Sequence, residues 1–492
     1  MSEPSVNGTM EPVTEKSSAS IAPHRVVVIG GGPGGYDAAL AAAQLGAKTV
    51  LIERAGVGGS AVLTDVVPSK TLIATADAAV AVGEASELGV QFRNSDSDEI
   101  EKPAITVNLE SVNKRLLALA KSTSKDMRAT LEAAGVTVLE AEGRLDGPHR
   151  VVARESGEGG KDIDSFDADT VIIAVGARPR TLPTAQPDGK RILTWTQLYN
   201  LTEIPEHLVV IGSGVTGAEF ASAYTNLGSR VTLVSSRDRV LPGEDGDAAK
   251  VLEDVFERRG MTLKSKARAD AVTATDTGIV VTLGDGSTIE GSHCLIAVGS
   301  IPNTADIGLE SAGVQMSDSG HILVNKVART SMSNIYAVGD CSDAPPLASV
   351  ASHQGRTAVF HTLGDFAKPL DTRLVCSNIF TSPEIATVGY TENDVTSGAV
   401  NGIVYKLDLD ANPRAKMQGT TDGFIKLIAQ PESGILIGGV IVAQRASELI
   451  NLLSFAMEHR HTVDQLARSW SVYPSLAGGI ADTAKGMHLL KK

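Results

Sequence analysis

Two glycine-rich segments could each bind the pyrophosphate of a dinucleotide. Residues 30–35 read GGGPGG and residues 212–217 read GSGVTG, and both follow a β-branched run and match G-x-G-x-x-G. In this spacing the first glycine allows a tight turn, the second lets the backbone approach a pyrophosphate, and the third lets a helix pack on a strand. The helix N-terminus then holds the phosphates. We predict two nucleotide sites with electron transfer between them. The predicted contacts are Gly30, Gly32, Gly35, Gly212, Gly214 and Gly217.

The residue at the end of the second strand of each unit should select the ribose. Glu53 lies 18 residues after Gly35, where a carboxylate accepts hydrogen bonds from ribose hydroxyls and rejects a 2′-phosphate. The same step after Gly217 reaches Ser235, and Arg237 follows two residues later. Without a carboxylate, and with an arginine to pair with a 2′-phosphate, the second site should accept NADPH and also NADH. A solvated surface position is the alternative for Glu53 and Arg237.

The elements around these residues alternate buried strands with helices, which is typical of doubly wound α/β layers. After the first fingerprint we predict a helix over 36–45 and a strand over 49–52. A long amphipathic helix follows over 109–134, and a hairpin-like stretch over 137–170.

An internal echo follows each fingerprint. Residues 173–179 read IAVGARP and residues 296–302 read IAVGSIP, which places Gly176 and Gly299 at equivalent positions. We interpret the two units as related, with the second inserted into the first. Past about residue 370 no fingerprint occurs, and the pattern predicts a separate α+β domain. Its predicted strands cover 423–427 and 436–442, and its helices cover 446–459 and 462–467.

Composition disfavours several classes of partner and site. A net charge of −14 argues against nucleic acid or an anionic membrane as the main partner. Three cysteines without paired spacing argue against a disulfide scaffold, we predict no metal site, and the setting fits a reducing cytoplasm. Residues 1–23 are rich in Ser, Glu, Pro and Thr, which predicts a disordered tail. No uninterrupted apolar run approaches about 18 residues, so we predict no membrane span.

The chain resembles flavoproteins of the pyridine nucleotide–disulfide oxidoreductase family over residues 24–480. Besides the fingerprints, residues 330–340 (TSMSNIYAVGD) resemble the family's second FAD motif, in which Asp340 would bind the ribityl part of the flavin. Residues 380–389 (FTSPEIATVG) resemble the start of its dimerisation domain. The resemblance implies FAD as cofactor, NADPH or NADH as co-substrate, and a homodimer.

The resemblance also implies a fold of class α/β with two Rossmann-like dinucleotide-binding domains and a C-terminal α+β dimerisation domain. The NAD(P) domain would be inserted in the FAD domain. The expected division is 24–180 and 301–370 for the FAD domain, 181–300 for the NAD(P) domain, and 371–492 for the dimerisation domain.

The chain departs from the family where disulfide chemistry would occur. Residues 58–70 (GGSAVLTDVVPSK) match the family segment G-G-T-C-x-N-x-G-C-x-P-S-K, but Ala61 and Val66 replace both cysteines. Neither side chain can form a thiolate, so thiol–disulfide exchange has no nucleophile. At the C-terminal base, Tyr473 and Gly478 stand where the family has a histidine and a glutamate. A tyrosine with a pKa near about 10 is a poor base at neutral pH.

The half of the apparatus that transfers electrons to the flavin is retained. Lys70 matches the lysine that lies near the flavin N5 in the family, and Glu219 matches its partner glutamate. A lysine there offsets the charge that the flavin gains, and the glutamate would position it.

We therefore predict an FAD-dependent NAD(P)H:quinone oxidoreductase without disulfide reductase activity, similar to the cysteine-less bacterial members of the family. A flat apolar quinone suits a pocket based on Ala61 and Val66, with Tyr473 of the other subunit as a stacking wall or proton donor. Three alternatives stay open: a soluble pyridine nucleotide transhydrogenase, a dihydrolipoamide dehydrogenase, and a non-enzymatic flavin-binding redox sensor.

Overall fold

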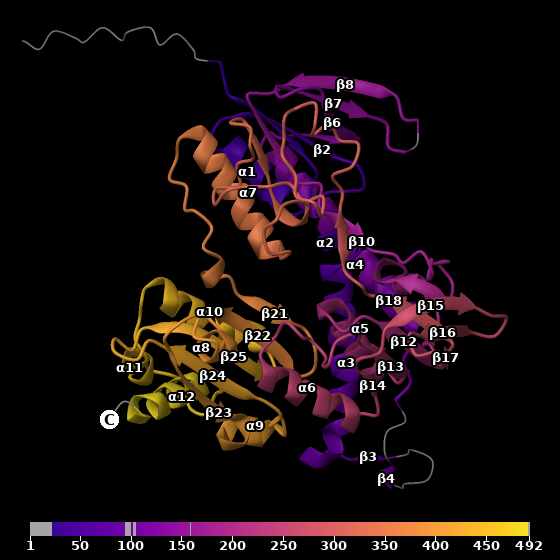
Figure 1. The fold of residues 1–492 in the computed structure, drawn as a ribbon, viewed down its shortest axis with the longest axis vertical. Coiled ribbons are helices and arrows are strands. Elements are labelled where there is room, and N and C mark those ends of the chain that lie inside the picture. Colours follow the sequence, from indigo (N-terminus) through magenta and orange to yellow (C-terminus); the bar gives the residue numbers. More distant parts are fainter. Residues whose placement is uncertain (1–21, 94–99, 102–104, 158, 491–492) are drawn as a thin grey trace, which may run out of the picture.

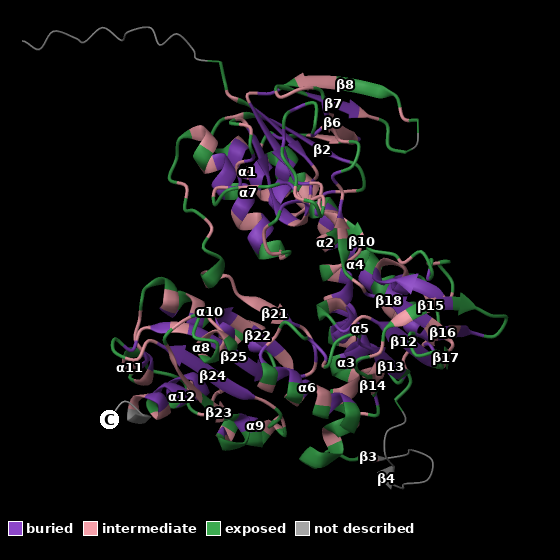
Figure 2. Cartoon of the chain, viewed as in Figure 1, coloured by how far each residue is buried: buried purple, intermediate pink, exposed green. Residues whose placement is uncertain are grey.

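The chain folds into three lobes, each with its own sheet (Figure 1). The computed structural model describes residues 22–93, 100–101, 105–157 and 159–490. Except for its last two residues, the tail predicted over 1–23 lies outside these ranges. Purple strands in the middle of each lobe mark the buried cores (Figure 2).

The first lobe is built on a five-stranded parallel sheet in the order β20–β9–β1–β2–β5. Its strands are β1 (Arg25–Ile29), β2 (Lys48–Glu53), β5 (Thr137–Glu140), β9 (Thr170–Ile173) and β20 (Ile335–Ala337). Apolar runs such as Val26–Ile29 suit strands that are covered on both faces. Helices α1 (Pro33–Gln44) and α7 (Ala348–Leu363) pack against each other beside this sheet.

The second lobe repeats this plan in the order β11–β18–β12–β13–β14, again with parallel neighbours. Its strands are β11 (Ile192–Thr194), β12 (His207–Ile211), β13 (Arg230–Val234), β14 (Thr262–Lys264) and β18 (His293–Ile296). Helices α5 (Val215–Asn226) and α6 (Gly246–Arg258) belong to it, and a small antiparallel sheet extends it. That sheet contains β15 (Ala269–Ala274), β16 (Ile279–Leu283) and β17 (Thr288–Gly291).

The two echo segments lie side by side where the chain crosses between these lobes. Strand β10 (Ala177–Pro179) pairs antiparallel with β19 (Ser300–Pro302), so that Arg178 stands opposite Ile301. Since β20 returns to the first sheet only after the second lobe is complete, the predicted insertion is confirmed. The individual domain boundaries stay predictions.

The segment over 137–170 differs in part from the predicted hairpin. Strand β5 pairs parallel with β2 and so belongs to the main sheet. Antiparallel pairing is confined to β6 (Glu142–Leu145), β7 (Arg150–Arg154) and β8 (Asp162–Asp167). Alternation alone did not indicate that the first strand would extend the edge of a parallel sheet.

The C-terminal lobe is an antiparallel sheet in the order β21–β22–β25–β24–β23, with helices packed on it. Its strands are β21 (Ser377–Ile379), β22 (Glu384–Gly389), β23 (Ile403–Asp408), β24 (Phe424–Ala429) and β25 (Leu436–Ala443). Its longer helices are α10 (Ala446–Glu458) and α12 (Leu476–Leu490), and the short α11 (Val463–Ala467) lies between them. The predicted α+β domain is confirmed.

One helical stretch, Gly59–Leu88, is long and apolar enough by length and composition to cross a membrane, with a mean hydropathy of 1.2. It contains α2 (Gly59–Leu63) and α3 (Val66–Glu84), and 22% of its most apolar window is buried. The expectation that no segment could span a bilayer therefore does not hold on composition alone. Because α3 contacts α4 (Leu109–Ala133) and α5, we interpret the stretch as part of the folded interior.

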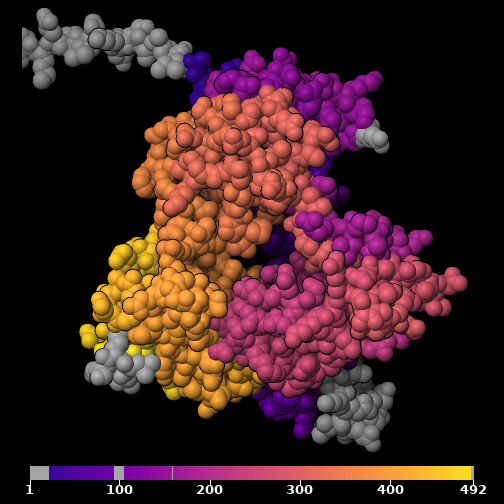
Figure 3. Space-filling view, in the orientation of Figure 1, coloured from indigo at the N-terminus to yellow at the C-terminus, as the bar shows by residue number. Residues whose placement is uncertain are grey.

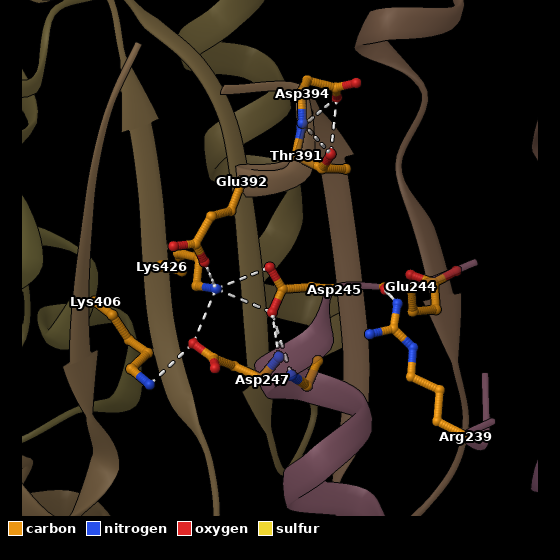
Figure 4. A network of polar contacts seen from close by, with 10 residues as sticks. Arg239, Glu244, Asp245, Asp247, Thr391, Glu392, Asp394, Lys406 and Lys426 are labelled. Atoms are coloured by element: carbon orange, nitrogen blue, oxygen red, sulfur yellow. Dashed lines mark hydrogen bonds and ion pairs between the residues drawn. The ribbon is translucent and has the colours of Figure 1, made fainter. Parts of the chain in front are cut away.

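A buried ionic cluster joins the second lobe to the C-terminal lobe (Figure 4). Lys426 Nζ lies 2.8 Å from Asp245 Oδ2 and 3.0 Å from Asp247 Oδ2, and it also donates to Glu392. The side chain of Lys426 is 1% exposed. The three carboxylates are close enough to hold a metal ion, but the lysine ammonium lies among them. The cation of this cluster is therefore a side chain.

Candidate functional site

The first fingerprint has one open glycine between two packed ones. Gly30 has φ +97°, and a Cβ there would lie 2.3 Å from the carbonyl oxygen of Ala174. A Cβ on Gly35 would lie 1.9 Å from the carbonyl oxygen of Gly30, whereas one on Gly32 would meet nothing within 4 Å. The strand and helix therefore need Gly30 and Gly35, and the space at Gly32 fits the pyrophosphate of a dinucleotide.

The second fingerprint repeats this geometry. Gly212 has φ +110°, and a Cβ there would lie 2.2 Å from the carbonyl oxygen of Ala297. A Cβ on Gly217 would lie 1.8 Å from the carbonyl oxygen of Gly212, and one on Gly214 would again meet nothing within 4 Å. Two equivalent phosphate cradles therefore stand at the carboxyl ends of two parallel sheets.

Glu53 ends β2 beside the first cradle and is 7% exposed. Its carboxylate accepts hydrogen bonds from the backbone N–H of Gly31 (2.5 Å), Ala55 (2.7 Å) and Gly56 (3.3 Å). An ionised carboxylate has about four acceptor positions, so room for a ribose hydroxyl remains. The buried position does not fit the solvated alternative, while the ribose contact itself stays a prediction.

Ser235 directly follows β13 beside the second cradle. Its hydroxyl accepts a hydrogen bond from Ser213 Oγ at 2.7 Å and from the N–H of Arg237 at 3.1 Å. The Arg237 side chain is exposed, and among the described residues it has no hydrogen-bond or ion-pair partner. It is therefore available to an anionic group.

A second arginine, which sequence reasoning missed, lines a pocket at this end of the sheet. Arg268 and Ser236 contribute to this pocket together with Gly212. The backbone positions Arg268, because the N–H of Ala267 donates to the carbonyl of Ser235 at 2.8 Å. Only the pairing of β13 with β14 brings the arginine here, and no local motif could have indicated it.

Three other predicted contacts lie at carboxyl ends of strands. Gly176 follows β9 with φ +63° and Gly299 follows β18 with φ +97°, and a Cβ on either would meet nothing within 4 Å. Asp340 lies on η3 (Gly339–Cys341), just after β20, and burial raises the pKa of its carboxyl. The structure thus places Asp340 and Gly176 at the same edge as the first cradle.

Lys70 and Glu219 meet at the junction of all three lobes. Lys70 Nζ lies 2.8 Å from Glu219 Oε2, and these side chains are 27% and 5% exposed. The other oxygen of Glu219 accepts the N–H of Phe380 at 2.8 Å, and Lys70 Nζ lies 4.8 Å from the centre of the Phe380 ring. The pair is therefore fixed by helices α3 and α5 and by the start of the C-terminal lobe.

The segment without thiols carries an acid that the sequence analysis did not single out. Ala61 and Asp65 are partly buried and Val66 is 37% exposed. Burial raises the pKa of Asp65 to about 6, Lys70 lowers it, and Glu219 and Asp340 raise it further. The departure of Asp65 from the glycine of the family segment was a signal that could have identified it.

Tyr473 lies away from this junction in an exposed segment of the C-terminal lobe. Its side chain is 81% exposed, and the neighbouring Trp470 and Val472 are also exposed. In the part of the chain that the structure describes, no hydrogen bond or ion pair links Tyr473 to Lys70. The structure of one subunit does not bring the predicted third catalytic residue to the other two.

The three cysteines are free, at 294, 341 and 376. Cys341 adjoins Asp340 but is fully buried, and burial raises the pKa of its thiol to about 11. A buried thiol of this kind is a weak nucleophile.

Comparison with known proteins agrees with this geometry. Residues 24–355 match the family model for pyridine nucleotide-disulphide oxidoreductases, and residues 375–484 match the model for their dimerisation domain. The chain is 45% identical over 470 residues to an NAD(P)H dehydrogenase (quinone) of Mycobacterium tuberculosis, covering 94% of this chain and 93% of that protein. It is 31% identical to a dihydrolipoyl dehydrogenase of Geobacillus stearothermophilus, covering 95% and 97%. The crystal structure of LpdA from Mycobacterium tuberculosis matches with a TM-score of 0.88 at 44% identity, covering 94% of this chain and 99% of that one.

Proposed function

Because the chain belongs to the pyridine nucleotide-disulphide oxidoreductase family, whose members use FAD and NAD(P)H, we propose that it is an NAD(P)H:quinone oxidoreductase without disulfide reductase activity. The observation that carries the proposal is an intact Lys70–Glu219 pair beside a segment in which Ala61 and Val66 replace the two thiols. The 45% identical relative is named for the same activity.

The two cradles assign the two nucleotides. FAD would lie on the first, held by the turn at Gly32, by Glu53 at the ribose and by Asp340 at the ribityl chain. NAD(P)H would lie on the second, at Gly214. When bound, FAD takes a hydride from NAD(P)H and passes two electrons to the acceptor. The positive charge of Lys70, fixed by Glu219, favours the electron-rich state of the ring.

The coenzyme pocket favours NADPH while leaving NADH acceptable. No carboxylate stands at the position of Ser235, and Arg237 and Arg268 supply two positive charges from neighbouring strands. A 2′-phosphate would form charge-assisted hydrogen bonds with either guanidinium. NADH lacks that phosphate but meets no repulsive carboxylate.

The acceptor would bind where the disulfide lies in other members. Ala61 and Val66 give this place an apolar base, which suits a flat quinone and offers nothing to a disulfide. We place Tyr473 of the partner subunit at the opposite wall, because a homodimer would cover the exposed segment around Trp470. A homodimer that works in the cytoplasm is part of the proposal.

Anaerobic stopped-flow spectroscopy of the FAD-loaded protein tests the proposal. NADPH and NADH should each bleach the flavin without the long-wavelength band of a thiolate–flavin pair, and menadione should then reoxidise it rapidly. Reductive titration should consume two electrons per subunit. Consumption of four electrons, or fast turnover of lipoamide with NADH, would refute it.

The remaining functions give different results in the same apparatus. A transhydrogenase would reduce an NAD analogue with NADPH faster than it reduces menadione. A redox sensor that is not an enzyme would keep its flavin oxidised in the presence of NADPH.

A further inference from the structure

We propose that Asp65 is the acid that protonates the quinone as it accepts electrons at this site. The inference rests on the proposed function and adds the source of the proton. Reduction of a quinone by a hydride leaves one oxygen without a proton, so a group at the acceptor site must supply it.

The backbone fixes Asp65 beside the place vacated by the thiols. Its N–H donates to the carbonyl of Ser60 at 2.8 Å, and its own carbonyl accepts the N–H of Ser69 at 2.8 Å. These bonds close the turn between α2 and α3. The turn adjoins the first cradle, because a Cβ on Gly59 would lie 2.9 Å from the Cα of Gly32.

The carboxyl of Asp65 has no fixed partner. Among the described residues no hydrogen bond or ion pair reaches it, and it does not cap its own helix. The charged and titratable groups around it come from four elements: Lys70 on α3, Glu219 on α5, Asp340 on η3, and Tyr199 on η2 (Trp195–Asn200). A partly buried acid that is free of internal bonds can donate to a bound molecule.

The neighbouring groups are less suited to give the proton. Lys70 is held by Glu219 at 2.8 Å. Burial raises the pKa of Tyr199 far above its ordinary value, and its hydroxyl is enclosed. Tyr473 is exposed on another lobe and would reach the site only from a partner subunit. Asp65, with a pKa of about 6, is the acid whose proton is available near neutral pH.

The face of the molecule in Figure 3 is hollowed at its middle, where indigo N-terminal residues lie at the floor between the orange and magenta regions. The helices α2 and α3 belong to this N-terminal part (Figure 1). A small molecule could therefore reach this part of the chain from solvent, and the same route would return a proton to Asp65.

The step balances as follows. NAD(P)H supplies a hydride, which reaches the quinone through the flavin as two electrons and one proton. The Asp65 carboxyl breaks its O–H bond and gives its proton to the second quinone oxygen, which completes the hydroquinone. Solvent then reprotonates the carboxylate.

The test is the pH dependence of flavin reoxidation by menadione, measured anaerobically on the FAD-loaded protein after reduction by NADPH. In the wild type the rate should fall as pH rises above about 6, by up to about tenfold per pH unit, because only the protonated carboxyl donates. Asp65→Asn should lower the rate at pH 5.5 by at least about tenfold and remove this pH dependence. Reduction by NADPH should stay within about twofold, since the carboxyl takes no part in it.

Two further variants and a spectroscopic measurement keep the test decisive. Asp77→Asn removes another carboxyl of α3 whose pKa is raised to about 6 by burial and by Glu384, and it should keep the wild-type profile. Asp65→Gly restores the family residue and should behave like Asp65→Asn if the latter misfolds. Infrared titration of the oxidised protein should show a carboxyl signal with a midpoint near 6 that is lost in Asp65→Asn but kept in Asp77→Asn.

Retention of the wild-type rate and profile in both Asp65 variants would refute the proposal, as would loss of the profile in Tyr473→Phe alone. Failure of menadione to reoxidise the wild type would instead refute the proposed function.

Discussion

At the scale of single residues, the chain has lost one half of a catalytic apparatus and kept the other. Ala61 and Val66 remove the nucleophiles, whereas Lys70 and Glu219 keep a close ion pair at 2.8 Å. A buried carboxylate such as Glu219 is costly unless it is paired. Its retention therefore indicates that the charge on Lys70 still has work beside the flavin.

Replacing that charge should change the flavin itself. Lys70→Met should lower the two-electron midpoint potential of the bound FAD by about 30 mV or more, because about 30 mV corresponds to 1.4 kcal/mol for two electrons. Spectroelectrochemical titration measures it. The double variant Lys70→Met/Glu219→Gln removes the unpaired buried carboxylate and separates the loss of charge from local misfolding. An exposed lysine, Lys48, provides the control as Lys48→Met, and equal potentials in all four proteins would contradict the assignment.

The coenzyme preference is also decided by single residues. Arg237→Ala and Arg268→Ala should each weaken binding of 2′,5′-ADP by about tenfold, since a charge-assisted hydrogen bond contributes about 1.5 kcal/mol. Binding of ADP, which lacks the 2′-phosphate, should be unchanged. Isothermal titration calorimetry with both ligands checks this. Parallel losses for ADP and 2′,5′-ADP would show that the arginines act on the fold and not on the phosphate.

At the scale of elements, the glycines of one fingerprint should fall into two classes. Gly32→Ala should leave the fold intact, because its Cβ meets nothing within 4 Å, but it should weaken FAD binding by occupying the phosphate space. Gly35→Ala should destabilise the apoprotein itself, because its Cβ would lie 1.9 Å from the carbonyl oxygen of Gly30. Thermal unfolding with and without FAD distinguishes the two.

The second fingerprint provides an internal control for this contrast. Gly214→Ala and Gly217→Ala should repeat the pattern with the coenzyme in place of FAD, since their Cβ environments are equivalent. If Gly32→Ala and Gly35→Ala lowered the stability of the apoprotein equally, the open cradle would not be a ligand site.

The elements that sequence reasoning predicted correctly are those whose signals are local. A strand, three glycines and a helix occupy about 20 consecutive residues, so Gly30 and Gly212 indicate their own surroundings. The pairing of β10 with β19, the position of Arg268 and the edge strand β5 depend on which distant segments meet. Asp65 was visible in the quoted motif, but its significance depends on burial among groups from four elements.

At the scale of the whole molecule, two polar contacts tie the lobes together. Glu219 on α5 binds both Lys70 of α3 and the backbone of Phe380 in the C-terminal lobe. Lys426 in β24 binds Asp245 at the start of α6. Both contacts place the second lobe against its neighbours, so the distance between the two cradles is set by side chains outside either fingerprint.

The Lys426 cluster should be essential because it is unequally buried. Asp245 is 3% exposed on its side chain, whereas Asp247 and Glu392 are 45% and 41% exposed and can be hydrated. Lys426→Met should therefore lower the free energy of unfolding by about 3–5 kcal/mol, chiefly by leaving Asp245 charged and unpaired. The urea midpoint, followed by circular dichroism, measures this change.

A second substitution should reverse most of that loss. Asp245 also caps α6 by accepting the N–H groups of Asp247 and Ala248, and an asparagine oxygen can do the same. Lys426→Met/Asp245→Asn should then be more stable than Lys426→Met alone, because the buried charge is gone while the cap remains. A double variant no more stable than the single one would mean that the ammonium, and not the neutralisation of Asp245, holds the lobes together. Slower flavin reduction by NADPH in Lys426→Met, with recovery in the double variant, would extend this dependence from stability to the alignment of the two nucleotides.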